Sequence, residues 1–186
     1  MSALSSPAAA AFARVDVAKL GRLVAPIDGD LFCHAPAARP FELEALAVPD
    51  DGHDRWSSPG TTTIYLAGDP LIALAEFARH GDARRSDDRR IVRLRLAPTP
   101  VLDLRRPAVV AAIGVDPERC GADRTEARSL SGAVRGAGIC AGLVVPSMAF
   151  RDDPQRFNVV LFAEAVDSLA DRLSEATEIG RVTVRG

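Results

Sequence analysis

Polar and hydrophobic residues alternate most strictly in residues 93–96, which read Arg-Leu-Arg-Leu. Because successive side chains of a strand point to opposite faces, this alternation predicts a half-buried strand with one face in water. The segment 101–104 is predicted to be its short neighbour. Aliphatic, β-branched and aromatic runs predict further strands at residues 29–34, 62–67, 142–147, 158–162 and 180–184.

One helix has clear boundary signals in the sequence. Asp69 is a typical N-cap residue, Pro70 suits the first helical position, and the pair His80-Gly81 ends the apolar run. Apolar residues at helical spacing predict further helices at residues 11–24, 107–113, 124–134 and 167–178. Residues 35–62 are rich in Pro, Asp, Gly and Ser, and we expect a long irregular connection of the kind that often carries function.

The predicted strands and helices follow one another without a regular βαβ rhythm. We therefore expect an α+β fold with a curved, largely antiparallel sheet and flanking helices. A length of 186 residues, with 47% hydrophobic and 26% charged residues, is typical of one soluble domain, so we expect residues 1–186 to form a single domain.

Charge and hydropathy argue against several classes of function. A formal net charge of −2 is unlike that of a general nucleic-acid or anionic-membrane binder. No run approaches the roughly 18 apolar residues of a membrane span, and the first residues do not resemble a secretory signal, so we expect a cytoplasmic protein. The three cysteines are far apart, and His34, His53 and His80 lack the paired spacing of metal ligands, so we expect no metal site.

Glu76 is the first candidate for chemistry, because it is the one charged residue in the apolar run 71–78. A helix that is apolar nearly all round should be mostly buried, and a buried carboxylate needs a partner or a wet cleft. Two interpretations stay open. Glu76 lies either in a cleft or on a solvent-facing stripe with Ile72 and His80.

Other candidates lie at the ends of the predicted strands. Arg55 and Trp56 end the long connection, just before a turn that leads to Tyr65. A guanidinium group suits phosphate and an aromatic face can stack on a heterocycle, so the combination is a candidate site. Taken singly, each residue is more often a surface arginine or a core aromatic residue, and these interpretations stay open. Ser147 follows a predicted strand without the elbow motif of a nucleophile, which favours a structural or substrate-positioning hydroxyl. Asn158 opens the next strand, where a turn or cap role is the default.

In order along the chain, these segments resemble the RES domain, which is named for its Arg, Glu and Ser. The resemblance rests on RWSSPGTTTIYLAGDPLIALAEFARH, GLVVPS and NVVLF, and it covers roughly residues 31–162. It implies a fold similar to ADP-ribosyltransferase toxins, and an enzyme that degrades NAD+ by hydrolysis or phosphorolysis. RES proteins are largely bacterial toxins of toxin–antitoxin pairs, so the resemblance also implies a helix-turn-helix (Xre-like) antitoxin as partner.

The resemblance assigns roles to individual residues. Glu76 corresponds to the family Glu and would stabilise the oxocarbenium charge that develops when nicotinamide leaves the ribose, or orient the attacking water or phosphate. Arg55 would hold the diphosphate. Tyr65, with Trp56, would pack on nicotinamide or its ribose. Ser147 would position the ribose or the amide.

His34 and Asn158 complete the expected substrate-binding set, and NAD+ is expected as substrate rather than as a cofactor. The chain departs from the family pattern at its first strand, where Phe32, Cys33 and His34 stand in place of an aromatic-Arg pair. It departs again at the turn HDRWS, where Ser57 replaces an Asn. Losing the first-strand Arg weakens one phosphate contact.

A homodimer, transfer of ADP-ribose to a protein, and a degenerate nucleotide- or partner-binding module all stay open as alternatives.

Overall fold

A computed structural model of the chain describes residues 7–47, 54–80, 87–153, 155–165 and 169–184, so the predictions for His53 and Gly81 lie outside the described residues. Six strands form one sheet in the order β1-β2-β5-β4-β3-β6. The strands are β1 (Ala25–Pro36), β2 (Thr63–Ala67), β3 (Asp87–Asp103), β4 (Gly142–Pro146), β5 (Phe157–Phe162) and β6 (Leu173–Val184). The helices are α1 (Pro7–Phe12), α2 (Val17–Gly21), α3 (Pro70–His80), α4 (Pro107–Ile113), α5 (Pro117–Ala122), α6 (Arg124–Ala137) and α7 (Leu169–Arg172), with short 3₁₀ helices η1 (Leu43–Leu46) and η2 (Ala163–Ala165).

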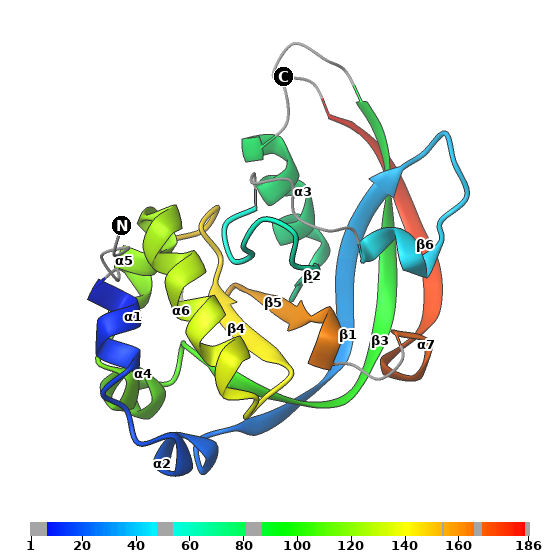
Figure 1. Cartoon of the computed structure of the whole chain (residues 1–186). Helices are drawn as coiled ribbons and strands as arrows, with labels where there is room; N and C mark the ends of the chain where they lie inside the picture. The colour runs from blue at the N-terminus through cyan, green and yellow to red at the C-terminus, as the bar shows by residue number, and fades with distance from the viewer. Residues whose placement is uncertain (1–6, 48–53, 81–86, 154, 166–168, 185–186) are drawn as a thin grey trace.

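The sheet is strongly curved because β1 pairs with both β2 and β3. Figure 1 shows β1 and β3 as long bent strands beside the shorter β2, β4 and β5. The pairing of β3 with β4, where Leu102 lies opposite Leu143, is parallel, and the other pairings are antiparallel. The expected α+β class and the largely antiparallel sheet are thus confirmed.

The alternation in residues 93–96 is confirmed, because Leu94 and Leu96 are buried while Arg93 and Arg95 face water. The prediction that residues 101–104 form a neighbouring strand is wrong. The same strand, β3, continues through Pro98 and Pro100 as far as Asp103. Because proline lacks a backbone N–H donor, the two prolines predicted the end of a strand. The pairing of β3 with β1 nevertheless continues across this stretch.

Of the helix predicted at residues 167–178, positions 167 and 168 lie outside the described residues, and 169–172 form α7. The prediction is wrong for residues 173–178, because 173–184 form strand β6, which pairs with β3 from Leu96 opposite Leu173 to Asp87 opposite Val184. Pairing with a neighbouring strand has overridden the local helical spacing. The single helix predicted at residues 11–24 is also wrong. The chain forms two short helices there, α1 and α2, and the Asp16 side chain caps α2.

Residues 48–53 of the predicted long connection lie outside the described residues. Its first part is more regular than expected, because Ala35 and Pro36 end β1 and a 3₁₀ turn, η1, follows. Helix α5 has no counterpart among the predicted elements. The predicted strands at 62–67, 142–147 and 158–162 and the helices that begin at Pro70, Pro107 and Arg124 are all present. None of the described helices is long and apolar enough to cross a membrane.

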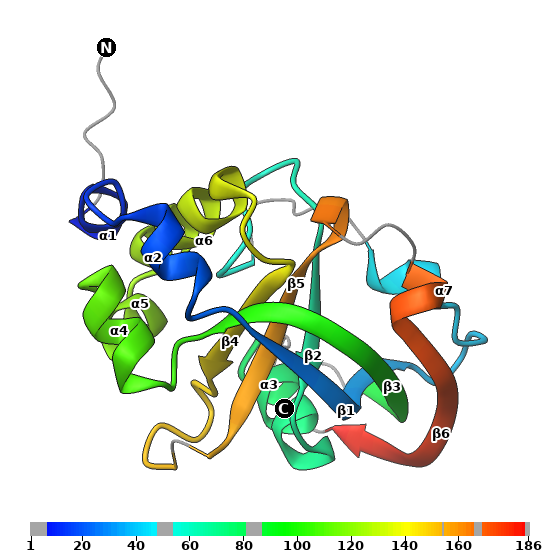
Figure 2. The same ribbon diagram turned by 90° about the horizontal axis from the view of Figure 1, so that it is seen from below.

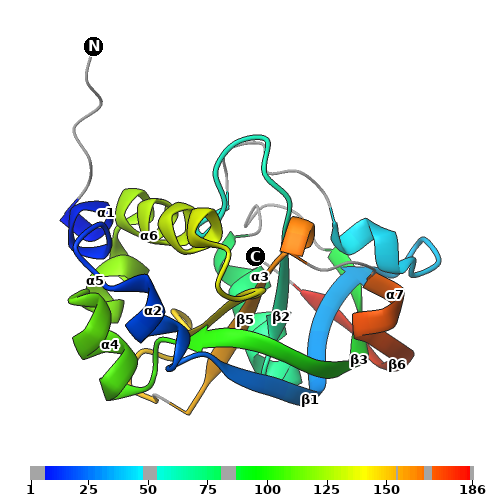
Figure 3. The same ribbon diagram turned by 60° about the horizontal axis from the view of Figure 1, so that its bottom comes forward.

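Among the described residues, the hydrophobic core has two large parts, one on each face of the sheet, and a third small cluster of Ala67, Ile72 and Ala73 at α3. The alternating side chains of β5 divide between the two large parts. Val160 and Phe162 belong to the part that packs under the helices, whereas Val159 and Leu161 belong to the other part. Figures 2 and 3 show α1, α2, α4, α5 and α6 gathered on one side of the molecule, with α7 and β6 at the other end. Leu43 and Leu46 of η1 pack on the second part.

Strand β4 packs closely against β5 at Gly142, so a larger residue there should destabilise the fold. A Cβ added at Gly142 would collide with the Val160 backbone oxygen and would lie 3.0 Å from Leu161 Cα. Gly142→Ala should therefore lower the free energy of unfolding by about 1–3 kcal/mol, the usual cost of overpacking a core. Chemical denaturation measures this loss.

Gly132→Ala on α6 is the matched control, since nothing lies within 4 Å of the added methyl group. Alanine is favoured over glycine inside a helix, so this variant should gain about 0.5–1 kcal/mol. Equal stability of the two variants would contradict the close packing of β4 on β5.

Candidate active site

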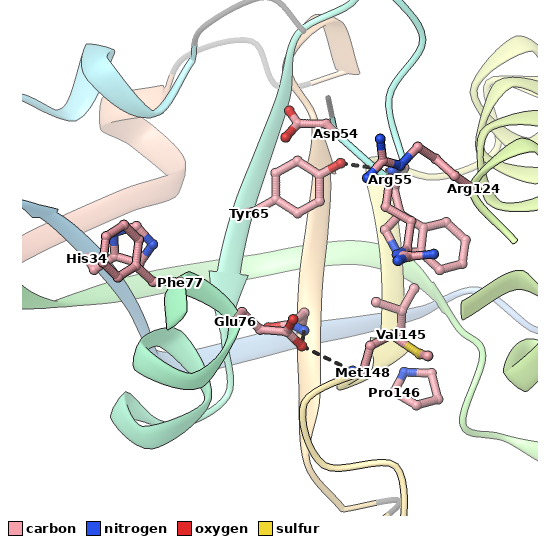
Figure 4. A pocket seen from close by; sticks show the side chains of 12 residues that line it. His34, Asp54, Arg55, Tyr65, Glu76, Phe77, Arg124, Val145, Pro146 and Met148 are labelled. Atoms are coloured by element: carbon pink, nitrogen blue, oxygen red, sulfur yellow. Dashed lines mark hydrogen bonds between the residues drawn. The ribbon is translucent and has the colours of Figure 1, made fainter. Parts of the chain in front are cut away.

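A cavity of about 530 Å³ opens between α3, the ends of β4 and β5, and the loop before β2. Figure 4 shows the side chains that line it. Of the predicted site residues, the cavity brings together His34, Arg55, Trp56, Tyr65, Glu76 and Asn158. Its other lining residues are Asp54, Phe77, Arg124, Val145, Pro146 and Met148. Its volume is within the usual range of small-molecule sites, about 300–1,000 Å³.

Glu76 reaches the cavity because of how α3 starts and packs. The Asp69 carboxylate accepts a hydrogen bond from Ile72 N at 3.0 Å, which caps the helix as predicted. Ile72, one turn before Glu76, is only 1% exposed, so that stripe of the helix faces the protein. The solvent-stripe interpretation of Glu76 is therefore wrong, and the cleft interpretation is confirmed.

One carboxylate oxygen, Glu76 Oε1, accepts hydrogen bonds from four donors. Two are the side chains of Ser147, at 2.8 Å from Oγ, and Asn158, at 3.2 Å from Nδ2. The others are the backbone N–H groups of Met148, at 3.0 Å, and Ala149, at 3.2 Å. Such donors compensate a carboxylate for its partial removal from water and fix its orientation. All four come from the turn between β4 and β5 and the start of β5.

The structure gives Ser147 and Asn158 a contact that the sequence did not predict. Ser147 is 1% exposed, and its hydroxyl group donates to Glu76, so it acts on the cavity through that carboxylate. Asn158 was expected in a turn or cap, or against the substrate. It lines the cavity and also bonds Glu76. Direct contact of either residue with a substrate stays a prediction.

The turn that supplies these donors is fixed at both ends. Met148 packs on α5, where a Cβ added at Gly121 would meet the Met148 sulfur and would lie 3.0 Å from its Cε. At the other end, Arg156 bonds Asp153 at 3.2 Å and approaches Asp69, at the start of α3, at 3.6 Å. The turn is thus held against α5 at one end and against the start of α3 at the other.

The loop that carries Arg55 is held by Tyr65 and by Arg128. Trp56 is 5% exposed and its backbone N–H donates to the Tyr65 hydroxyl at 2.9 Å. On the other side, Arg128 of α6 donates from Nε and Nη2 to the Asp54 carbonyl oxygen, at 3.0 and 2.5 Å. Tyr65 therefore has a positioning role besides any contact with a ligand.

His34 of β1 lies at the far end of the cavity. The centroid of its ring is 4.6 Å from that of Phe77. The Arg89 guanidinium carbon lies 4.1 Å from the same Phe77 centroid. His34 also lines an adjoining cavity of about 260 Å³, together with Cys33. Burial raises the pKa of the Cys33 thiol to about 12, so this thiol stays protonated near neutral pH and is a poor nucleophile.

Sequence reasoning missed six lining residues, of which two are charged, Asp54 and Arg124, and four are apolar, Phe77, Val145, Pro146 and Met148. Asp54 is adjacent to Arg55 in the sequence, and an acid beside a candidate phosphate ligand was a usable signal. Arg124 is the first residue of α6 and carries no local signal, because only the fold brings that helix to the cavity. Within the described ranges, no group of three His, Cys, Asp or Glu residues is placed to hold a metal ion.

Comparison with known proteins places the chain in a family. The model of the RES domain matches residues 31–183. The chain belongs to the RES domain family. The match extends the sequence resemblance beyond residue 162 to include β6.

A chain of the crystal structure of the M. tuberculosis MbcT–MbcA toxin–antitoxin complex has a similar fold. The TM-score is 0.65 at 17% sequence identity, over 91% of each chain. A search of curated proteins gives no match. At this identity the likeness establishes the fold of the RES domain alone.

In this RES domain, Trp56 is the only tryptophan, so its fluorescence reports on the loop that carries Arg55. Arg128→Ala removes the two hydrogen bonds to the Asp54 carbonyl. We expect a red shift of the Trp56 emission, stronger quenching by acrylamide, and a loss of about 1–3 kcal/mol in stability from the unsatisfied carbonyl.

Thr125→Ala, an exposed position on the same helix, should leave the emission unchanged. If Arg128→Ala has the same emission and quenching as the wild-type protein, Arg128 does not hold this loop.

Proposed function

We propose that this RES domain cleaves the bond between nicotinamide and ribose in NAD+ and acts as the toxin of a toxin–antitoxin pair. The observation that carries the proposal is Glu76, a carboxylate held by four donors at the wall of a cavity that also contains arginine and aromatic side chains. Family membership supports the same assignment.

The reaction needs a fixed negative charge beside the ribose. As the C1′–N bond breaks, its electron pair goes to the nicotinamide ring and positive charge develops on C1′ and the ring oxygen. A preorganised carboxylate stabilises that charge without having to reorient during the reaction. The hydrogen bonds from Ser147 and Asn158 hold Glu76 Oε1 in place for this role.

The two arginines that line the cavity suit the diphosphate of the dinucleotide. Arg55 comes from the loop before β2 and Arg124 from the start of α6, and both lie on the side of the cavity away from His34 and Phe77 (Figure 4). Guanidinium groups bind phosphate oxygens in pairs. Arg124 thus offers a second cation in a chain whose first strand has no arginine at Phe32 to His34.

A flat aromatic group fits the part of the cavity formed by Tyr65. Its ring lies between the loop and α3 in Figure 4, and its hydroxyl is fixed by the Trp56 N–H. A nicotinamide ring packed on Tyr65 would place the adjoining ribose toward Glu76. The arginines would thus bind the phosphate end of the nicotinamide nucleotide, and Tyr65 would pack on its nicotinamide end.

A toxin role follows from the chemistry and has support from the fold comparison. Loss of NAD+ stops many essential reactions, so a cell that makes such an enzyme needs an inhibitor. The similar fold found in a toxin–antitoxin complex favours a protein antitoxin, for which we propose a helix-turn-helix protein. Transfer of ADP-ribose to a protein and a purely binding role remain outcomes that the experiments below separate.

The first test uses the purified protein. Glu76→Gln keeps the size of the side chain and an oxygen acceptor but removes the charge. It should preserve the fold and the binding of an uncleavable NAD+ analogue while slowing NAD+ cleavage by about 10²-fold or more. Nicotinamide release, followed by chromatography, measures the rate.

Glu118→Gln, at an exposed position of α5, is the matched control and should cleave NAD+ at the wild-type rate. An unchanged rate in Glu76→Gln would remove this carboxylate from the mechanism. Radiolabel from NAD+ that appears on a protein would identify transfer instead.

The second test is made in cells. Inducing the chain in a bacterial host without an antitoxin should deplete cellular NAD+ before growth stops, because loss of the dinucleotide is the expected cause of arrest. The Glu76→Gln strain should make as much protein yet keep its NAD+ and continue to grow. Arrest at normal NAD+, or equal arrest in both strains, would reject the toxin proposal and favour a binding role.

A further inference from the structure

Asp54 brings a second carboxylate to the cavity. It lines the main cavity and the adjoining smaller one, and Glu76 lines both as well. In the view of Figure 4 the two carboxylates lie on opposite sides of the Tyr65 ring. A ligand bound in this cavity therefore meets two carboxylates, one from the loop before β2 and one from α3.

The backbone at Asp54 is fixed. Its carbonyl oxygen accepts two hydrogen bonds from Arg128, and its carboxylate Oδ2 lies 3.4 Å from Ser57 Oγ, which donates to it. Ser57 is itself 1% exposed and lies 3.5 Å from the Tyr65 hydroxyl. These contacts set the position of the carboxylate relative to the Tyr65 ring, which is the preorganisation that acid–base catalysis requires.

The charges that line the cavity match the charges of NAD+. The lining includes two arginines, Arg55 and Arg124, and two acids, Asp54 and Glu76. The arginines complement the two negative charges of the diphosphate. One acid, Glu76, complements the positive charge that develops on the ribose, and Asp54 is the second carboxylate of the lining.

We propose that Asp54 is the general base that activates water, and that this RES domain is therefore an NAD+ hydrolase rather than a phosphorylase. The inference rests on the proposed function. The C1′–N bond breaks and its electron pair goes to nicotinamide, while a water oxygen forms the new bond to C1′. The water proton passes to Asp54 and then to solvent, which gives ADP-ribose, nicotinamide and one proton.

The same carboxylates disfavour inorganic phosphate as the acceptor. Phosphate carries one to two negative charges near neutral pH, and two carboxylates close to its binding position repel it, whereas water is neutral. Both cavity arginines are occupied by the diphosphate in this arrangement. The experiment therefore includes inorganic phosphate as a competing acceptor.

The test measures the products that the purified full chain forms from NAD+ with and without inorganic phosphate, using phosphorus NMR or anion exchange. The wild-type protein should yield ADP-ribose in both conditions. Asp54→Asn keeps an oxygen acceptor for Ser57 and leaves the backbone contacts to Arg128 intact. It should hydrolyse NAD+ about 10²-fold more slowly, the lower end of what a general base contributes, and bind the uncleavable analogue at least as tightly.

Two further variants separate a chemical role from a structural one. Asp152→Asn, an exposed position in the turn between β4 and β5, should hydrolyse NAD+ at the wild-type rate. In Asp54→Ala, added sodium formate should restore part of the hydrolysis, because a small carboxylate can take the vacated position. Formate should not restore Glu76→Gln, whose amide still fills its site.

Each outcome decides the inference. ADP-ribose phosphate as the main wild-type product, or an undiminished hydrolysis rate in Asp54→Asn, would overturn it while NAD+ cleavage stands. Loss of rate without rescue by formate would make Asp54 a structural residue and overturn the general-base role. If the wild-type protein consumes no NAD+ at all, the proposed function fails and this inference fails with it.

Discussion

The Glu76 carboxylate cannot be held in a half-buried cleft unless its hydrogen bonds are satisfied, and this requirement connects three elements of the fold. Helix α3 supplies the carboxylate, the turn after β4 supplies the Ser147 hydroxyl and two backbone N–H groups, and β5 supplies the Asn158 amide. Strands β4 and β5 are neighbours in the sheet, so donors that are distant in sequence converge on one oxygen. Displacing any of these elements would leave a buried polar group without its partner.

The supports of this arrangement lie outside the cavity. Gly121 lets Met148 pack closely on α5, Gly142 lets β4 approach β5, and Arg156 joins the turn to the start of α3. On the opposite wall, Arg128 and Tyr65 hold the loop of Arg55 and Asp54 from two sides. The geometry of the candidate site thus depends on backbone contacts and small residues as much as on the residues that would touch a ligand.

The charge distribution of the cavity is the physical basis of our proposal that this RES domain acts on a dinucleotide. Two arginines and two carboxylates line the same confined space, where Coulomb interactions are stronger than in water. NAD+ carries the opposite charges: its anionic diphosphate would face the arginines, and its cationic nicotinamide ring would face the carboxylates. The single departure of the first strand, which has His34 and no arginine, is offset in our proposal by Arg124.

The sequence by itself determined the elements with strong local signals and the residues next to them. Asp69 and Pro70 start α3, the Arg-Leu alternation marks β3, and the motif around Arg55, Tyr65 and Glu76 indicated the family. These signals are local, because capping, pleating and turn chemistry act over a few residues.

Tertiary structure decided the rest. Residues 173–178 became strand because β3 offered a pairing edge, and β3 ran on through Pro98 and Pro100 because β1 lay beside it. The contacts of Ser147 and Asn158 with Glu76, and the presence of Arg124 in the cavity, join residues far apart in the chain. No local pattern encodes such contacts, because they exist only once the sheet has curved and the helices have packed on it.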